Sequence, residues 1–202
     1  MGTGFGTGPR AVNNQLRGES FALPHLSRHA KWRVKFNAGV RFLENRWFVL
    51  LLFVVACFGV AGIGSFWTSS SVNTWYAGLR KPSFTPPSWI FAPVWSTLYL
   101  LMALSAWLVW RAAGWSGSRV ALLLFLAQLA LNLAWSGLFF GLRRPDLALV
   151  DIGLLLASII ATALAFRTFS SLASWLLVPY GLWVAFATLL NFKIWRLNSI
   201  SV

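Results

Sequence analysis

Long apolar runs separated by short polar links dominate the chain. Five of these runs are about 20 residues long, the length that an α-helix needs to cross the hydrocarbon core of a bilayer. They cover residues 47–66, 90–110, 120–142, 147–166 and 172–194. None of them shows the alternation of apolar and polar residues that is typical of a membrane β-barrel strand. The pattern therefore predicts an all-α integral membrane protein with a five-transmembrane-helix bundle.

The links that follow the second, third and fourth runs are short and rich in helix-stopping residues. They read "AAGWSGS" at 112–118, "RRPD" at 143–146 and "RTFSS" at 167–171. Short links make consecutive helices antiparallel neighbours. We therefore expect one membrane domain over residues 47–198, with a short tail at 199–202.

The composition excludes an ordinary soluble domain and separates the first 46 residues from the rest. The chain is 58% hydrophobic and 10% charged, with a mean hydropathy of +0.69. Much of the net charge of +13 lies in residues 1–46, which predict a basic, flexible amino-terminal tail without a cleavable signal. Attraction to anionic lipid headgroups explains this charge more simply than nucleic acid does, because no folded basic face accompanies it.

The positive-inside rule places the amino terminus in the cytoplasm. The membrane that we expect is a bacterial one. An arginine-rich amino terminus also resembles a transit peptide, so a mitochondrial or other organelle membrane is the alternative.

Residues suited to catalysis or metal binding are scarce. His25 and His29 lie four positions apart but have no third ligand in reach, and Cys57 lies among apolar residues of the first run. The sequence contains no phosphate-binding glycine loop, HExxH, Cys-x-x-Cys or Ser-His-Asp set. Asp151 lies one turn into the fourth run, where we favour an interfacial position near a helix amino terminus. The sequence predicts neither a metal site nor a required cofactor.

The third run carries the most informative polar pattern. Gln128, Asn132 and Trp135 follow one another at i, i+4 and i+7 and so share one helix face. Amides in hydrocarbon need partners, so we expect this face to turn inward, either to bond neighbouring helices or to line a cavity. The second run adds Trp95 and Tyr99, which are also four positions apart. The last run contributes Pro179, Tyr180, Trp183, Phe186 and Asn191. Inward aromatic rings with a few polar groups suit a flat, mostly apolar ligand.

Small residues recur at every fourth position of the fourth run, at Ala157, Ala161 and Ala165, while the first run offers Ala61 and Ser65. This spacing lets helices approach closely. For the fourth run, packing within the bundle is the favoured interpretation.

Several blocks in the chain resemble successive blocks of the TspO family, the translocator proteins also called tryptophan-rich sensory proteins or peripheral-type benzodiazepine receptors. The blocks are "WYAGLRKPSFTPPSW", "PVWSTLY", "QLALNLAW", "FFG", "ALVD" and "PYGLWVAFATLLNFKIWRLN". They run in order from about Trp75 to Asn198, so nothing from the family transfers to residues 1–46. The resemblance implies a five-helix bundle, commonly a homodimer, with a ligand cavity beneath the loop between the first two helices.

The resemblance also implies ligands and site residues. Family ligands include porphyrins such as protoporphyrin IX and related tetrapyrroles, sterols in animal members, and benzodiazepine-site compounds. By matching position, the cavity would be lined by Trp95, Tyr99, Asn132, Trp135, Trp183, Ala187 and Leu190. The loop would act as a lid that comprises Trp75, Arg80, Lys81, Pro82, Pro86, Pro87 and Trp89.

Two departures from the family pattern matter. Phe192 stands where the sterol motif has a tyrosine, which argues against physiological sterol binding, and Ser83 and Phe84 stand where some bacterial relatives carry tryptophans.

The favoured function is a membrane receptor or sensor that binds porphyrins, with Arg80 or Lys81 meeting the propionate groups. A transporter of porphyrins or other hydrophobic molecules is the first alternative, although no broken half-helix repeat supports it. The second alternative is a light-dependent porphyrin-degrading enzyme in which Trp95 and Trp135 are oxidised partners.

Overall fold

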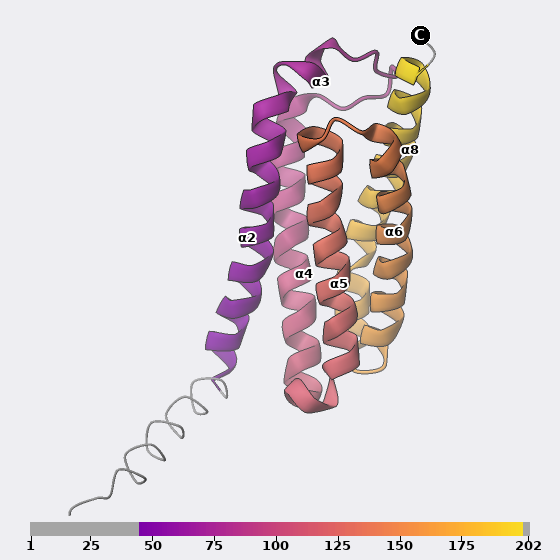
Figure 1. Cartoon of the computed structure of the whole chain (residues 1–202). Coiled ribbons are helices and arrows are strands. Elements are labelled where there is room, and N and C mark those ends of the chain that lie inside the picture. The colour runs from indigo at the N-terminus through magenta and orange to yellow at the C-terminus, as the bar shows by residue number, and fades with distance from the viewer. Residues whose placement is uncertain (1–44, 200–202) are drawn as a thin grey trace, which may run out of the picture. The chain divides into compact units, whose positions relative to one another are not determined.

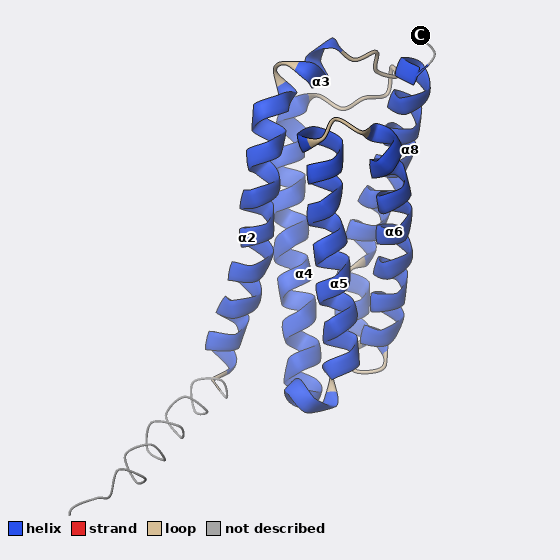
Figure 2. Cartoon of the chain, viewed as in Figure 1, coloured by secondary structure: helices blue, strands red, loops and turns tan. Residues whose placement is uncertain are grey.

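The computed structural model describes residues 45–199, and these residues form the predicted five-helix membrane domain. Nearly all of the predicted basic tail, including both histidines, lies outside the described residues, as do the last three residues. The spans long and apolar enough to cross a bilayer are Arg46–Val72, Ser88–Gly117, Arg119–Gly141, Pro145–Arg167 and Ser171–Ser199. The described residues contain helices and loops without strands, so the predicted all-α class is confirmed (Figure 2).

The spans pack side by side, and consecutive spans run antiparallel (Figure 1). Helix α2 (Arg46–Val72) packs against α4 (Ser88–Gly117) and α5 (Arg119–Ser136). Helix α6 (Pro145–Arg167) packs between α5 and α8 (Val178–Ser199), and the short α7 (Ser171–Leu176) contacts α4 and α6. The loop that contains α3 (Trp75–Gly78) lies at the same end of the bundle as the α5–α6 link and the end of α8. We call this the lid end.

Helix α2 continues past its predicted end at residue 66 to Val72. Hydroxyl groups explain the extension, because they bond to the helix's own carbonyls rather than to solvent. Thr68 donates to the carbonyl of Gly64 at 3.0 Å, and Ser70 donates to that of Trp67 at 2.8 Å. A serine- and threonine-rich segment can therefore remain helical at a membrane boundary.

The predicted link at 112–118 is mostly helical. Helix α4 runs to Gly117, with one break at Gly114, whose φ of 64° lies in the left-handed region that glycine adopts without strain. Ser118 alone separates α4 from α5.

At the lid end, α5 continues into the π-helix η1 (Gly137–Gly141). The indole of Trp67 lies against this turn, where a Cβ added at Gly137 or Gly141 would stand 3.4 or 3.3 Å from it. The hydroxyl of Ser71 also donates to the carbonyl of Phe140 at 2.6 Å. Glycine thus permits the close contact between α2 and η1, and this contact places the "FFG" block beneath the loop.

The last span was predicted as one helix, and this is wrong, because it breaks at Leu177 between α7 and α8. Pro179 explains the break, since proline has no N–H to continue the α7 ladder but fits the first turn of a new helix. The amide of Leu177 instead bonds the carbonyl of Ser174 at 3.1 Å. The break positions Tyr180 at the start of α8.

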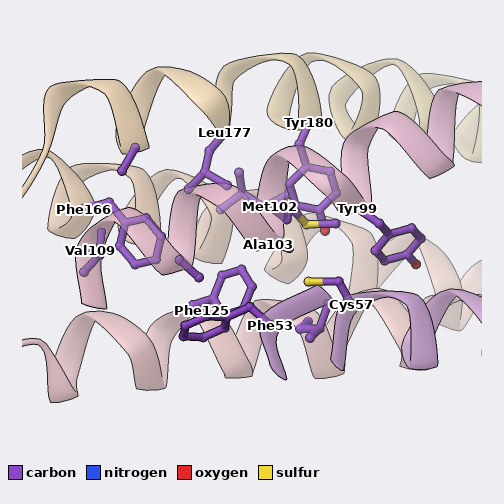
Figure 3. Close-up of a cluster of buried hydrophobic side chains, with 14 of the residues drawn as sticks. Phe53, Cys57, Tyr99, Met102, Ala103, Val109, Phe125, Phe166, Leu177 and Tyr180 are labelled. Carbon is purple, nitrogen blue, oxygen red and sulfur yellow. The ribbon is translucent and has the colours of Figure 1, made fainter. Parts of the chain in front are cut away.

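The interior of the bundle is a cluster of aromatic and aliphatic side chains from every span (Figure 3). Phe125 lies near its centre, edge-on to Phe53 with ring centroids 6.2 Å apart and stacked on Phe166 at 6.0 Å. Such packing holds helices together in lipid, where the hydrophobic effect between them is absent.

The small-residue stripe of α6 does not pack within the bundle as favoured from the sequence. Ala157 and Ala161 are exposed, Ala165 is half-buried, and Gly153, one turn earlier, is also exposed. The inner face of α6 instead carries the larger Ile152, Leu155 and Ile159, which fill the core. The stripe therefore faces outward from the described domain.

Candidate lid-end ligand site

A polar network crosses the bundle below the lid end. The hydroxyl of Tyr99 on α4 donates to Oδ1 of Asn132 on α5 at 2.5 Å, and Nδ2 of Asn132 donates to the hydroxyl of Tyr180 on α8 at 3.2 Å. All three residues are buried. Asn132 thus joins three helices, which confirms that the polar face of α5 turns inward and gives this amide the role of interhelical bonding.

Gln128, one turn away on the same face, is also buried but less well satisfied. Its Nε2 lies 3.8 Å from the sulfur of Met102, and its Oε1 has no partner among the described residues.

An aromatic layer lies between this network and the lid. The ring of Trp135 stacks on Phe139 of η1 at 5.3 Å, and Trp75 of α3 meets Phe139 edge to face at 5.7 Å. Tyr76 packs on Phe140 at 5.7 Å. The indole N–H of Trp135 is buried and has no acceptor within residues 45–199.

A second group of rings closes the layer on the α8 side. Trp183 lies edge to face with Phe91 of α4 at 5.9 Å and tilts against Phe186 at 5.6 Å. Phe84 of the loop reaches Phe186 at 6.3 Å. Trp95 lies between the layer and the polar network, with its ring 5.7 Å from that of Tyr99.

The structure brings the predicted cavity residues to one end of the bundle. Tyr99, Asn132 and Leu190 are buried, and the half-buried members are Trp95, Trp135, Trp183 and Ala187. The ring of Trp95 contacts that of Tyr99, whereas Trp135 and Trp183 contact neighbouring phenylalanine rings. A planar ligand that enters here must separate the loop aromatics from those below.

The loop is fastened to the end of α8 by a reciprocal pair of hydrogen bonds. The backbone N–H of Arg80 donates to Oδ1 of Asn198 at 3.0 Å, and Nδ2 of Asn198 donates to the carbonyl of Arg80 at 3.0 Å. Asn198 is held in place because Nδ2 also donates to Ile194 at 2.7 Å. We call this pair the Arg80–Asn198 latch.

The loop itself is stiffened locally. Thr85 bonds the carbonyl of Pro82 through both its amide, at 3.1 Å, and its hydroxyl, at 2.8 Å. The ammonium of Lys81 donates to the carbonyls of Ala77 and Leu79 at 3.1 and 3.2 Å and lies 4.8 Å from the ring centre of Tyr76. Burial raises the pKa of the Tyr76 hydroxyl, so this ring remains neutral beneath the cation.

The predicted lid residues occupy different environments. Trp75, Lys81, Pro82 and Pro86 are half-buried, whereas Arg80, Pro87 and Trp89 are exposed. Trp89 is 73% exposed at the start of α4, which is the position of a membrane-interface anchor.

Asp151 is not interfacial, as was favoured from the sequence. It is only 8% exposed, and its Oδ2 has no hydrogen-bond partner within the described residues. The cause is its helix face, which it shares with Ala148, Ile152 and Leu155 on the inner side of α6. A carboxylate in this position is costly unless it is protonated or finds a donor.

Sequence reasoning missed three residues of the site: Phe91, Phe139 and Asn198. Tyr180 and Phe186 were expected to face inward, and the structure has Tyr180 buried and Phe186 half-buried. Asn198 had no sequence signal, because its partner is a backbone group 118 residues away. Among the described residues, no group of three His, Cys, Asp or Glu side chains could hold a metal ion.

These features define a class: a multi-pass integral membrane protein whose five-helix bundle is closed at one end by an aromatic, proline-rich loop. The family model described as TspO/MBR family matches residues 52–196. The chain belongs to the TspO/MBR family.

The chain matches several relatives over most of their length. The chain is 45% identical over 150 residues to the Tryptophan-rich protein TspO of Archaeoglobus fulgidus, covering 74% of this chain and 97% of that protein. It is 45% identical over 138 residues to the Translocator protein of Homo sapiens, covering 67% and 82%. It is 39% identical over 152 residues to the Tryptophan-rich sensory protein of Cereibacter sphaeroides, covering 75% and 92%.

Proposed function

We propose that this protein is a membrane receptor or sensor that binds porphyrins or related tetrapyrroles at the lid end. The observation that carries the proposal is the aromatic layer between the loop and the Tyr99–Asn132–Tyr180 network. Rings from α3, α4, α5, η1 and α8 pack there in pairs, with centroids 5.3–5.9 Å apart. Aromatic faces stack well on a planar macrocycle, and a bundle that needed packing alone would use leucine and alanine.

Two buried polar atoms without partners in residues 45–199 support a ligand that carries both N–H donors and nitrogen acceptors. Trp135 lies six residues before the end of η1, and Asp151 lies six residues after the start of α6. At 1.5 Å per residue, both lie about 9 Å below the α5–α6 link. Trp135 offers a buried N–H and Asp151 a buried acceptor. The centre of a free-base porphyrin presents both N–H groups and bare nitrogens, which match this pair.

Arg80 is the better partner for the propionate groups. Its side chain is exposed, whereas the ammonium of Lys81 already donates to two loop carbonyls. In this proposal, Arg80 binds a carboxylate at the membrane surface, and Lys81 holds the loop in shape.

The test is titration of the purified protein with protoporphyrin IX, read as saturable quenching of tryptophan fluorescence. Trp135→Ala and Trp183→Ala should each weaken binding by about 1 to 3 kcal/mol, the scale of one large aromatic contact. Trp175→Ala is the matched control, because Trp175 is 70% exposed on α7 at the opposite end. Wild-type affinity in both site variants would contradict the proposal.

The same samples discriminate the two alternatives. A light-dependent enzyme would convert the porphyrin into a new product under illumination, and loss of Trp95 and Trp135 would stop that turnover. A transporter would move porphyrin across sealed vesicles. A receptor returns its ligand unchanged and shows saturable binding in the dark.

We further propose that two copies associate through the outward face of α6. Gly153, Ala157 and Ala161 are exposed at every fourth position, and a Cβ added at Gly153 would meet no atom within 4 Å. This face lets a second helix approach closely.

A further inference from the structure

Two grooves open at the end of the bundle opposite the lid, on either side of the first turns of α5. The first has a volume of about 450 Å³ and is lined by Trp115, Ser116, Arg119, Leu122, Leu123 and Leu126. The second has a volume of about 310 Å³ and lies between the start of α5 and the end of α6, where Ala165, Thr168 and Phe169 form its far wall. Ser116 and Arg119 line both grooves.

The α4–α5 connection shapes this double groove. The positive φ of Gly114 redirects the end of α4, so that Trp115 and Ser116 lie beside the start of α5. Trp115 is held as a wall by Phe53 and Trp110, whose rings lie 5.8 and 5.9 Å away. The first groove is therefore formed by packed side chains.

Arg119 brings an uncompensated positive charge to the ridge between the grooves. It is exposed and makes no ion pair or hydrogen bond with any described residue, whereas Arg111 at the same end lies 4.7 Å from the ring centre of Trp107. The acidic residues of the described part, Asp146 and Asp151, lie in the lid-end half of α6. An anion at Arg119 therefore meets no nearby carboxylate from residues 45–199.

The depth of these residues matches the layers of a bilayer. Arg119 is the first residue of α5, at the end of a membrane span, where a headgroup phosphate lies. Leu126 is seven residues further on, about 10 Å deeper at 1.5 Å per residue, within the hydrocarbon. The grooves thus begin at headgroup level and descend along apolar walls.

We propose that this double groove binds one anionic phospholipid, with its phosphate on Arg119 and one acyl chain in each groove. A two-chain lipid fits because the two apolar grooves meet at a single cation. An anionic headgroup is favoured because a zwitterionic one carries its own cation to a surface that is already positive. The site lies at the end opposite the porphyrin site, so either proposal can fail without the other.

The test measures lipid binding to the full-length purified protein by native mass spectrometry, with phosphatidylglycerol and phosphatidylcholine of the same chain length. We expect Arg119→Gln to weaken phosphatidylglycerol binding about fivefold and to leave phosphatidylcholine binding unchanged, because one arginine near a membrane surface supplies an attraction of that size. Arg167→Gln is the matched control, since it removes the same charge from the same end but lines neither groove. Equal losses in the two variants, or equal affinity of the wild type for both lipids, would overturn the proposal.

A second pair of measurements tests the acyl chains. Leu126→Trp places a larger ring on the wall of the first groove and should weaken phosphatidylglycerol binding severalfold, while helix content and porphyrin affinity stay unchanged. Glycerol 3-phosphate, which carries the same phosphate without chains, should not displace the lipid. Wild-type lipid affinity in Leu126→Trp, or displacement by glycerol 3-phosphate at lipid-like concentrations, would show that the grooves hold no chain.

Discussion

The Arg80–Asn198 latch gives the sharpest test of whether the loop is a lid. Asn198→Ala removes both hydrogen bonds between the loop and α8, at 3.0 Å each, and leaves the aromatic rings in place. If the loop must detach from α8 before a porphyrin can leave, the variant should release its ligand faster. Capture should become faster as well, because the ligand-free loop must also open before a porphyrin can enter.

The magnitude follows from the two bonds. A neutral hydrogen bond contributes about 0.5 to 1.5 kcal/mol net, and exposed bonds lie at the lower end of this range. Loss of both should therefore destabilise the closed loop by about 1 to 2 kcal/mol, which corresponds to release that is roughly 5 to 30 times faster. Loss of the third bond, from Nδ2 to Ile194, affects only the end of α8.

Stopped-flow fluorescence measures the two rates separately. Mixing protein with porphyrin gives the capture rate, and mixing the complex with an excess of a ligand-free protein that traps dissociated porphyrin gives the release rate. Ser199→Ala is the matched control, because its hydroxyl bonds only the carbonyl of Trp195 within α8, at 2.7 Å. Asn198→Asp keeps an acceptor for the Arg80 N–H but loses the donor, so its release rate should lie between wild type and Asn198→Ala. If Asn198→Ala releases porphyrin at the wild-type rate with unchanged helix content, the loop is not the gate.

Three further expectations follow from the same geometry. Replacing Pro86 and Pro87 together by alanine should speed release more than it slows capture, because ordering a floppy loop costs roughly 1 to 2 kcal/mol per residue; equal effects on both rates would argue for a simple tether. Arg80→Ala should weaken the binding of protoporphyrin IX but not of its neutral dimethyl ester, and Lys81→Ala should weaken the binding of both by loosening the loop. An equal loss of affinity for the two ligands in Arg80→Ala would contradict the proposed contact with the propionate groups. In mild detergent and in nanodiscs the protein should have the mass of a homodimer, and Ala157→Phe should shift it to the monomer; a wild-type monomer in both would refute association through α6.

The sequence was sufficient for the membrane class and the inward polar face of α5, because both follow from strong constraints. Apolar runs of helical length have few alternatives in a bilayer, and an amide such as Asn132 must find a partner there. Element ends were harder to predict. The hydroxyls of Thr68 and Ser70 extend α2 by donating to carbonyls of the preceding turn. Composition does not reveal whether such a hydroxyl bonds to the helix or to water.

Side-chain orientation was the main source of error. Asp151 and Ala157 lie six residues apart on α6, a separation that turns one side chain inward and the other outward. The positions of Ile152 and Leu155 fixed which face was inner, yet an almost uniformly apolar helix conceals that choice in the sequence. In lipid, both faces are apolar, so only the contacts with neighbouring helices decide.

The position of the latch explains why a lid of this kind can be reversible. Arg80 is exposed and Asn198 half-buried, so water can replace their hydrogen bonds when the loop lifts. If the latch alone sets the preference for the closed state, at about 1 to 2 kcal/mol, roughly 3 to 15% of molecules are open. A ligand that meets one of these open molecules can enter. The same two bonds within hydrocarbon would have no water to replace them, and each opening would leave polar groups unpaired at a cost of several kcal/mol. A gate placed at the membrane boundary can therefore open thermally, whereas the Tyr99–Asn132–Tyr180 network below it remains closed and holds the helices together.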